Sequence, residues 1–423
     1  MPMERKVQLK RYTLDNSALF YPIMATKKAQ SLFRVSVVLS DKVDGVLLEE
    51  ALNEALLRFP AFKTKLKMGY AWHYLGENLE RAKVFDKSKG LLKPINPKET
   101  DGYQFRLIYE ENNIYLEVFH GICDGTGAMA FLKGILQKYR QLQGKEVDGD
   151  GLVDFSVTDF DEENEDSCQR YYTPIKFADA DIKSLTGATP QLIKGTLSDG
   201  YSATTYFGKY SEIGKLAKDR GVTFTAFMSG VMAHSLAKIN YGDKPIVIMV
   251  PVNLRAVFES KSVRNFVTFV RLVFDRENCG DVESCIIEAS KQLTATTKKE
   301  ELNKTIATQV RAQKTGLLKI APLWVKMAIA KFLRLFLKSR QTTIISNLGR
   351  LDVPDCLGIE KAYFNVNVSK NAKTNLGVVT VGDTVAFTFT KSIEENTVGD
   401  TFVSVLNDMG GNLQQQPKRN LKQ

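Results

Sequence analysis

At 423 residues, with 43% hydrophobic and 25% charged residues, the chain has the composition of an ordinary soluble globular protein and is too long for a single core. Its net charge of +10 predicts an acidic partner, but no basic run with interleaved aromatics and no nucleic-acid motif is present, so we expect no nucleic acid. No Cys-x-x-Cys pair and no secretory segment occur, which favours a cytoplasmic protein without a disulfide framework or zinc site. The five cysteines are Cys123, Cys168, Cys279, Cys285 and Cys356.

The first part of the chain alternates predicted strands and helices. Residues 31–39 are β-branched and short, as in a strand. Residues 47–58 repeat apolar side chains at helical spacing, with Asp41 or Asp44 placed to cap the helix and Pro60 placed to stop it. Further strands are predicted at residues 63–70, 71–75, 103–110 and 113–119.

The most informative stretch is residues 120–125, which read His-Gly-Ile-Cys-Asp-Gly. It follows a period-2 strand pattern and precedes an apolar run at helical spacing that begins near residue 129. Gly121 and Gly125 supply the backbone freedom for a tight reversal, and they let another molecule approach the main chain. The order strand, sharp turn, helix therefore places a histidine at the end of a strand.

A strand-end histidine suits general base catalysis. Neutral imidazole removes a proton from a hydroxyl or amine at physiological pH, so His120 is the candidate base. The alternative is a buried His120 whose ring nitrogens are satisfied by the backbone. Asp124 is expected to fix the turn rather than to orient the ring. The other histidines, His73 and His234, lie among apolar neighbours and are predicted to be structural.

The second part of the chain begins near an acidic run, residues 159–166, which we interpret as a solvated linker. The predicted lobes are therefore residues 1–165 and 166–423. Mixed strands and helices in both parts predict an α/β fold of two sandwich lobes. Strands are expected at residues 202–210, 245–254, 265–275, 342–347, 361–368, 377–381 and 384–390. Helices are expected at residues 211–219, 223–239, 282–313 and 397–409.

Residues 316–338 form a basic amphipathic segment whose charges exclude a membrane-spanning helix. Two interpretations stay open. The segment either makes peripheral contact with an anionic membrane or packs on the second lobe with its basic side chains outward. We favour packing. The basic residues are Lys319, Lys326, Lys331, Arg334 and Lys338.

The spacing His120-x-x-x-Asp124-Gly125 resembles the active-site motif of the chloramphenicol acetyltransferase-like superfamily. That group includes peptide-synthetase condensation domains, plant acyltransferases and alcohol acetyltransferases. Other segments are similar to the family and stand in the family order. They are residues 43–66, like the opening helix and strand; 250–255, like a segment whose arginine pairs with the motif aspartate; 264–266, like Gly-Asn-Phe; and 346–349, like Ser-Asn-x-Gly.

Some positions depart from the family pattern. Phe119 stands where many relatives have a second histidine, and Arg264 stands where glycine is usual. The late Asp-Phe-Gly-Trp-Gly of the plant enzymes is absent. The chain is most similar to the alcohol acetyltransferase-like branch.

The resemblance implies two lobes of mixed sheets covered by helices, with a channel between them. It implies an acyltransferase that moves an acyl group from a coenzyme A or carrier-protein thioester to an alcohol or amine, with no metal and no tightly bound cofactor. His120, with Asp124 and Gly125, would form the catalytic motif, His120 acting as base without an acyl-enzyme. Asp124 would pair with Arg255 as a structural ion pair. The channel would be lined by Asn265, Ser346 and Asn347.

Two other classes of function stay open. Cys123 beside His120 suggests a cysteine hydrolase or transferase, but nucleophile and base normally come from separate segments. A non-catalytic binding or scaffold protein would keep the fold without turnover. If the protein is an enzyme, the apolar strands at residues 267–273 and 364–368 predict greasy channel walls suited to a fatty or aromatic substrate. An acyl carrier protein is then a candidate partner.

Overall fold

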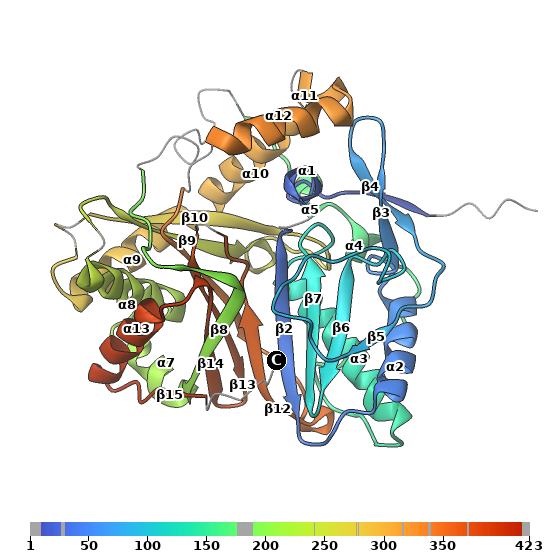
Figure 1. Cartoon of the computed structure of the whole chain (residues 1–423), viewed down its shortest axis with the longest axis horizontal. Coiled ribbons are helices and arrows are strands. Elements are labelled where there is room, and N and C mark those ends of the chain that lie inside the picture. Colours follow the sequence, from blue (N-terminus) through green and yellow to red (C-terminus); the bar gives the residue numbers. More distant parts are fainter. Residues whose placement is uncertain are drawn as a thin grey trace, which may run out of the picture.

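The computed structural model shows two large sheets side by side and a small sheet next to the first (Figure 1). Helices cover the outer faces of the large sheets, which gives the two-lobed α/β architecture that the sequence predicts. The structure describes residues 10–416 except 27–29, 176–188, 241, 276, 278, 315–316, 337–339 and 370–371.

The first lobe is built on a five-stranded sheet in the order β12-β2-β7-β6-β5. Strand β2 (Leu32–Leu39) is buried along its whole length, and it pairs antiparallel with β7 (Asn113–Phe119). Helices α2 (Gly45–Arg58) and α3 (Gly125–Leu142) pack on each other and on this sheet, and Asp44 caps α2. The outer strands are β6 (Phe105–Glu110), β5 (Val84–Asp86) and β12 (Ile359–Asn365).

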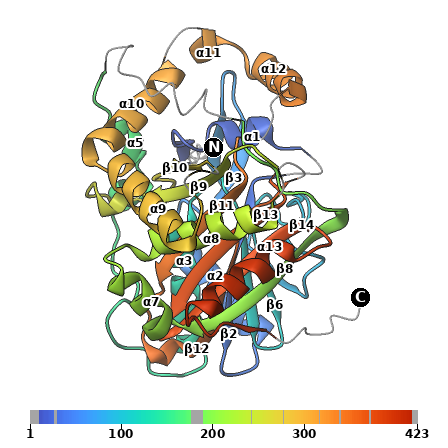
Figure 2. The same cartoon turned by 90° about the vertical axis from the view of Figure 1, so that its left-hand side faces the viewer.

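The second lobe has a seven-stranded mixed sheet in the order β10-β9-β11-β13-β14-β8-β15. Helix α8 is buried between the sheet and its neighbouring helices, and α13 lies beside it (Figure 2). The helices are α7 (Tyr210–Asp219), α8 (Phe224–Ile239), α9 (Val282–Thr296) and α13 (Thr397–Asp408). The strands are β8 (Leu197–Lys209), β9 (Ile246–Asn253), β10 (Val267–Phe274), β11 (Thr343–Arg350), β13 (Thr374–Val381), β14 (Thr384–Ile393) and β15 (Gln414–Gln415).

Strand β12 ties the two lobes together. It comes from the second part of the chain, yet it pairs antiparallel with β2 of the first sheet, with Phe364 opposite Val35. The division into residues 1–165 and 166–423 stays a prediction, to which β12 is an exception. The end of β12 consequently lies where the two sheets meet.

A small sheet and several short helices complete the fold. In the small sheet β1 (Arg11–Thr13) pairs with β4 (His73–Glu77), which pairs with β3 (Thr64–Met68). Helix α1 (Phe20–Met24) follows β1. The other short helices are α4 (Asp161–Asn164), α5 (Ser167–Arg170), η2 (Leu254–Ala256) and η4 (Asp355–Leu357).

The single helix predicted at residues 282–313 is wrong, because α9 ends at Thr296 and α10 (Lys299–Lys314) begins after a break. At the break the hydroxyl of Thr296 donates to the carbonyl of Gln292, and that of Thr297 donates to Leu293, both at 2.7 Å. Hydroxyls that bond to the preceding turn destabilise and bend helices. These threonine contacts lie at the point where α9 ends.

The acidic run at residues 159–166 is not a solvated linker throughout. Glu163 accepts both guanidinium nitrogens of Arg58, at 2.6 and 2.7 Å. Asp166 accepts the backbone N–H of Asn16 at 2.9 Å and caps α5. These carboxylates join the run to the first lobe, which a count of charges does not reveal.

The basic segment at residues 316–338 forms α11 (Leu317–Ile320) and α12 (Leu323–Phe336). The prediction that its apolar side packs inward is wrong: Trp324 is 70% exposed and Phe332 61%, whereas Lys326 is only 5% exposed. Lys319 and Lys331 are exposed. Lys338 and the side chain of Arg334 lie outside the described residues. No helix in the described part is long and apolar enough to cross a membrane.

Candidate active site

His120 is held at the end of β7 by its own backbone. Its N–H donates to the carbonyl of Ser31 at 2.8 Å, which joins the turn to the start of β2. The chain then reverses, and α3 begins at Gly125. The half-buried imidazole therefore lies on the side of the first sheet that faces the second lobe.

Asp124 anchors this turn to the second lobe. Its Oδ1 accepts the N–H of Gly127 at 3.0 Å as the cap of α3, and its Oδ2 accepts the N–H of Phe266 at 2.9 Å. Arg255 Nη1 lies 2.8 Å from the same Oδ2, within ion-pair distance, and the two side chains are 2% and 11% exposed. Asp124 thus bonds to two backbone N–H groups and to Arg255, which matches a structural role.

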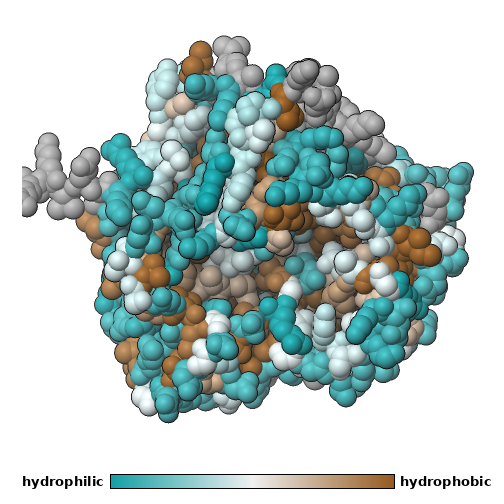
Figure 3. Space-filling model, turned by 180° about the vertical axis from the view of Figure 1, so that it is seen from behind, coloured by the Kyte–Doolittle hydropathy of each residue, from teal (hydrophilic) through white to brown (hydrophobic). Residues whose placement is uncertain are grey.

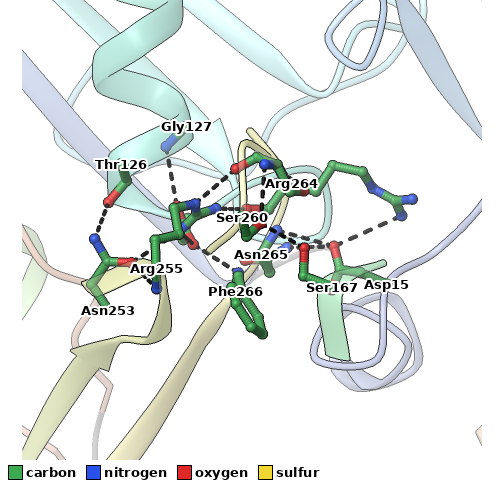
Figure 4. Close-up of polar contacts among 12 residues, drawn as sticks. Asp15, Thr126, Gly127, Ser167, Asn253, Arg255, Ser260, Arg264, Asn265 and Phe266 are labelled. Atoms are coloured by element: carbon green, nitrogen blue, oxygen red, sulfur yellow. Dashed lines mark hydrogen bonds and ion pairs between the residues drawn. The ribbon is translucent and has the colours of Figure 1, made fainter. Parts of the chain in front are cut away.

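Arg255 is fixed in turn by acceptors of its own segment. Its Nε donates to the carbonyl of Ser262 at 2.7 Å, its Nη1 to Asn253 Oδ1 at 3.2 Å, and its Nη2 to the carbonyl of Arg264. Figure 4 shows Arg255 between Asn253 and Arg264, next to Gly127. The guanidinium therefore joins the start of α3 to the segment between β9 and β10.

The amide of Asn265 lies against the imidazole. Asn265 Oδ1 is 2.8 Å from His120 Nδ1, and Asn265 Nδ2 donates to the carbonyl of His120 and to Asp15 Oδ2, both at 3.0 Å. Because both hydrogens of Nδ2 are used, the oxygen faces the ring, and Nδ1 is the nitrogen that donates to it. In the neutral ring this contact selects the tautomer in which Nε2 has the lone pair, which is the form that a general base needs.

Asp15 orients this amide, a role that the sequence does not predict. It is fully buried between β1 and α1, accepts the N–H and the side chain of Asn265, and lies 3.8 Å from Arg264 Nη2. Figure 4 shows Asp15 beside Asn265. Its other oxygen accepts the N–H of Ala18, so in the sequence Asp15 looks like a local turn residue. Its partner is 250 residues away.

Aromatic rings hold the imidazole from two sides. The ring of Tyr21, from α1, stacks on that of His120 with centroids 4.7 Å apart, and Phe33 meets it edge-on at 5.2 Å. Burial, with Asp15 and Asp124 nearby, raises the pKa of Tyr21. Tyr21 therefore stays a neutral phenol and supplies a flat wall rather than a charge.

A cavity of about 350 Å³ opens beside His120 between the two lobes. The molecule is hollowed near the centre of the face in Figure 3, and apolar residues gather around the hollow. Asp124, Gly125, Ser346 and Asn347 line the cavity as well. Its apolar walls come from both sheets and consist of Leu32, Phe33, Val267, Phe269, Ile344, Leu348, Phe364, Val366 and Val368.

The predicted channel residues thus divide into two groups. Ser346 and Asn347 line the cavity, and Asn347 Nδ2 also donates to Thr225 Oγ1 at 3.3 Å. Asn265 is buried behind the imidazole, so its expected place on the channel wall is corrected to a contact with the ring of His120. A Cβ at Gly125 would lie 2.4 Å from Leu348 Cδ2 of β11, so any other residue at this position would have to displace that side chain.

Cys123 does not face this cavity as a nucleophile would. It is fully buried, and burial together with the nearby Asp124 raises the pKa of its thiol well above the usual range. A reactive cysteine needs the thiolate and access to the substrate. This observation disfavours the cysteine hydrolase. Within the described residues no cluster of histidine, cysteine and carboxylate side chains suits a metal ion.

The buried Asp15 and the half-buried Asp166 make stability depend on pH. Burial, and then the nearby charge of Asp15, raise the pKa of Asp166 to about 6, and burial also raises the pKa of Asp15. The folded state therefore keeps protons that the unfolded state releases above about pH 4. The contribution of Asp166 to the free energy of unfolding consequently falls as pH rises from about 4 to 6.

We expect Asp166→Asn to remove this fall in the free energy of unfolding between about pH 4 and 6. Relative to the wild type, the free energy of unfolding of the variant should rise with pH by about 1 to 3 kcal/mol between pH 4 and 7. Urea unfolding of both proteins at each pH measures this difference. The exposed Asp154→Asn is the control. A wild-type-to-variant difference that is constant across the range would contradict the assignment.

Comparisons with known proteins support the fold. No protein-family model and no curated protein sequence matches the chain. The first condensation domain of the calcium-dependent antibiotic synthetase, in complex with a substrate analogue, is 11% identical with a TM-score of 0.65, and the match covers 95% of this chain and 97% of that one. The trichothecene 15-O-acetyltransferase TRI3 from Fusarium sporotrichioides is 10% identical with a TM-score of 0.60, covering 96% of each chain.

A third solved structure is a mutant starter condensation domain of the rhizomide synthetase RzmA in complex with C8-CoA. It is 12% identical with a TM-score of 0.62, and the match covers 95% of this chain and 94% of that one. The chain therefore shares the fold of these condensation domains and of this acetyltransferase, which confirms the predicted fold class of two α/β lobes. The alcohol acetyltransferase branch stays a prediction.

Proposed function

We propose that the protein is an acyltransferase that moves an acyl group from a thioester to an alcohol or amine. The observation that carries the proposal is the position of His120, which lines the cavity between the lobes. Its Nδ1 lies 2.8 Å from Oδ1 of Asn265, which is buried behind the ring. We propose that Nε2 of the neutral ring acts as the base, because His120 lines a cavity that can admit a substrate. The likeness in fold to an acetyltransferase and to a domain with bound C8-CoA supports it.

In the proposed reaction His120 Nε2 takes the proton of the acceptor as its oxygen or nitrogen attacks the thioester carbonyl. The new C–O or C–N bond forms, the C–S bond breaks, and the imidazolium returns the proton to the leaving thiolate. Because thioesters are activated, a base and correct positioning supply most of the required catalysis. No acyl-enzyme is needed, which agrees with the burial of Cys123.

The cavity walls favour apolar substrates. Phe33, Phe269 and Val368 line the cavity together with other apolar side chains, and such walls suit a fatty or aromatic group better than a sugar. The donor is proposed to be acyl-CoA or a phosphopantetheinyl carrier, and the acceptor an alcohol, as in alcohol acetyltransferases. The described cysteines are all free, which fits a cytoplasmic enzyme.

Asn265 is proposed as the residue that positions the base. We expect Asn265→Ala to lower kcat about tenfold or more while the KM for the acceptor stays nearly constant, because the ring loses the contact that fixes its tautomer. The matched control is Asn347→Ala, which removes an amide of the cavity wall instead. Equal kcat for wild type and Asn265→Ala would contradict a positioning role.

The proposed function is tested by a panel of donors and acceptors. Acetyl-, octanoyl- and palmitoyl-CoA are mixed with the protein and with aliphatic alcohols, aromatic alcohols or amines, and the released thiol is measured. We expect thiol release that requires an acceptor and exceeds the background of His120→Ala. Release no faster than in that variant, for every pair and also with acyl carrier protein as donor, would leave a non-catalytic binding protein as the better account.

A further inference from the structure

Helix α12 turns its apolar side to solvent. It lies across the top of the molecule with α11, above α1 (Figures 1 and 2). A stripe of large apolar side chains along its outer side is exposed although such residues normally face a core. The α12 face is defined here as Ile320 at the end of α11, together with Trp324, Met327, Ile329 and Phe332 of α12.

The inner side of α12 is held by few but specific contacts. The N–H of Leu323 donates to the carbonyl of Tyr70 at 2.7 Å, in the loop between β3 and β4. Lys326 Nζ donates to the carbonyl of Ala71 at 2.6 Å and lies 3.5 Å from the centre of the Trp72 ring. A lysine thus occupies an inward position beside the buried Leu323, while Trp324, Ile329 and Phe332 stay exposed.

The α12 face continues onto neighbouring elements. Phe20 and Met24 of α1 are exposed, as are Met68 and Tyr70 at the end of the small sheet. A cavity of about 250 Å³ lies between α1 and α12, with Met24 and Met327 among its lining residues. The apolar surface therefore spans three separate elements on one side of the molecule. Exposed apolar surface of this kind marks an interaction site.

The charge around the α12 face favours an anionic partner. Residues 302–351 contain ten lysines and arginines and no aspartate or glutamate. Lys319 and Lys331 are exposed next to the apolar stripe. Tryptophan and phenylalanine flanked by basic residues are typical of helices that lie in the plane of a membrane interface, where lysines attract anionic headgroups. A second copy of the same face would bring like charges together.

We propose that the α12 face docks on a bilayer containing anionic phospholipid. Trp324 and Phe332 enter the headgroup region, and the exposed lysines contact phosphate. Helix α1 lies between the two cavities. Its Tyr21 lines the cavity beside His120, and its Met24 lines the cavity between α1 and α12. Docking therefore places the bilayer next to the cavity with the apolar walls. The docking itself does not rest on the proposed acyl transfer.

Trp324 reports on the docking directly. The chain has two tryptophans, so Trp72→Phe leaves Trp324 as the only one, and phenylalanine keeps an aromatic ring beside Lys326. Its fluorescence is followed as vesicles of phosphatidylglycerol and phosphatidylcholine, or of phosphatidylcholine alone, are added. We expect a blue shift and cosedimentation with the anionic vesicles, and weaker binding to the neutral ones or at high salt.

A double variant, Trp324→Ser with Phe332→Ser, should bind the anionic vesicles at least tenfold more weakly than the wild type. Leu57→Ser is the matched control, because Leu57 is an exposed apolar residue of α2, outside the α12 face. The proposal would be overturned if Trp72→Phe showed no blue shift and neither it nor the wild type cosedimented with the anionic vesicles. A dimer in solution that the double variant dissociates would also overturn it, because a second copy would then cover the face.

Discussion

Replacing His120 with alanine should lower kcat/KM for acyl transfer by at least about a hundredfold, because the attacking hydroxyl or amine loses its general base. The imidazole is half-buried at the wall of the cavity, and its loss leaves the backbone contact with Ser31 in place. The melting temperature should therefore change little. Initial rates and thermal unfolding on the same preparation give both numbers.

The control for this variant is Ser346→Ala, which changes another polar side chain of the cavity and should lose much less activity. A His120→Ala protein that turns over at a near wild-type rate with saturating acceptor would end the assignment of the base. A variant that loses activity and also unfolds early would instead point to a structural histidine.

Asp124→Asn should destabilise the protein by several kcal/mol, on the order of 3 to 5, because it leaves the charge of Arg255 without its buried partner. The same oxygen accepts the N–H of Phe266, so an amide in its place cannot satisfy both donors equally well. Activity should fall as well, because Asp124 holds the N–H of Phe266, the residue next to Asn265, which contacts His120. Chemical unfolding and initial rates measure the two effects.

The matched control is Glu162→Gln. It removes a carboxylate from the pair with Lys261, in which both side chains are well exposed, so we expect no measurable change in stability. A melting temperature of Asp124→Asn equal to that of Glu162→Gln would show that the buried pair contributes nothing, and it would contradict the structural role of Asp124.

The sequence predicted the parts of the site that depend on local order. A strand pattern, a turn with two glycines and a helix pattern place His120 correctly, because each signal is read within a few residues. The contact between Asp124 and Arg255 spans 131 residues and was predicted only from the family resemblance. Contacts of that separation leave no periodic signal in a single sequence.

Asp15 and β12 show where such reasoning stops. Asp15 reads as a turn residue, and only the fold brings it to Asn265. β12 has an ordinary strand pattern, and nothing in that pattern says that it joins the first sheet. For α12 the spacing correctly predicted two faces but not which one points inward. Periodicity gives amphipathicity, whereas orientation depends on what the helix meets.

The measurement that tests the central claim most directly is the balance of products. The protein is incubated with an acyl-CoA and an acceptor from the panel, and mass spectrometry quantifies free thiol, acylated acceptor and intact protein. We predict one acylated acceptor for each thiol released, no acylated protein at any time, and unchanged products in Cys123→Ala. Acyl transfer to the protein itself, or thiol release without an acylated acceptor, would contradict direct transfer with His120 as the base.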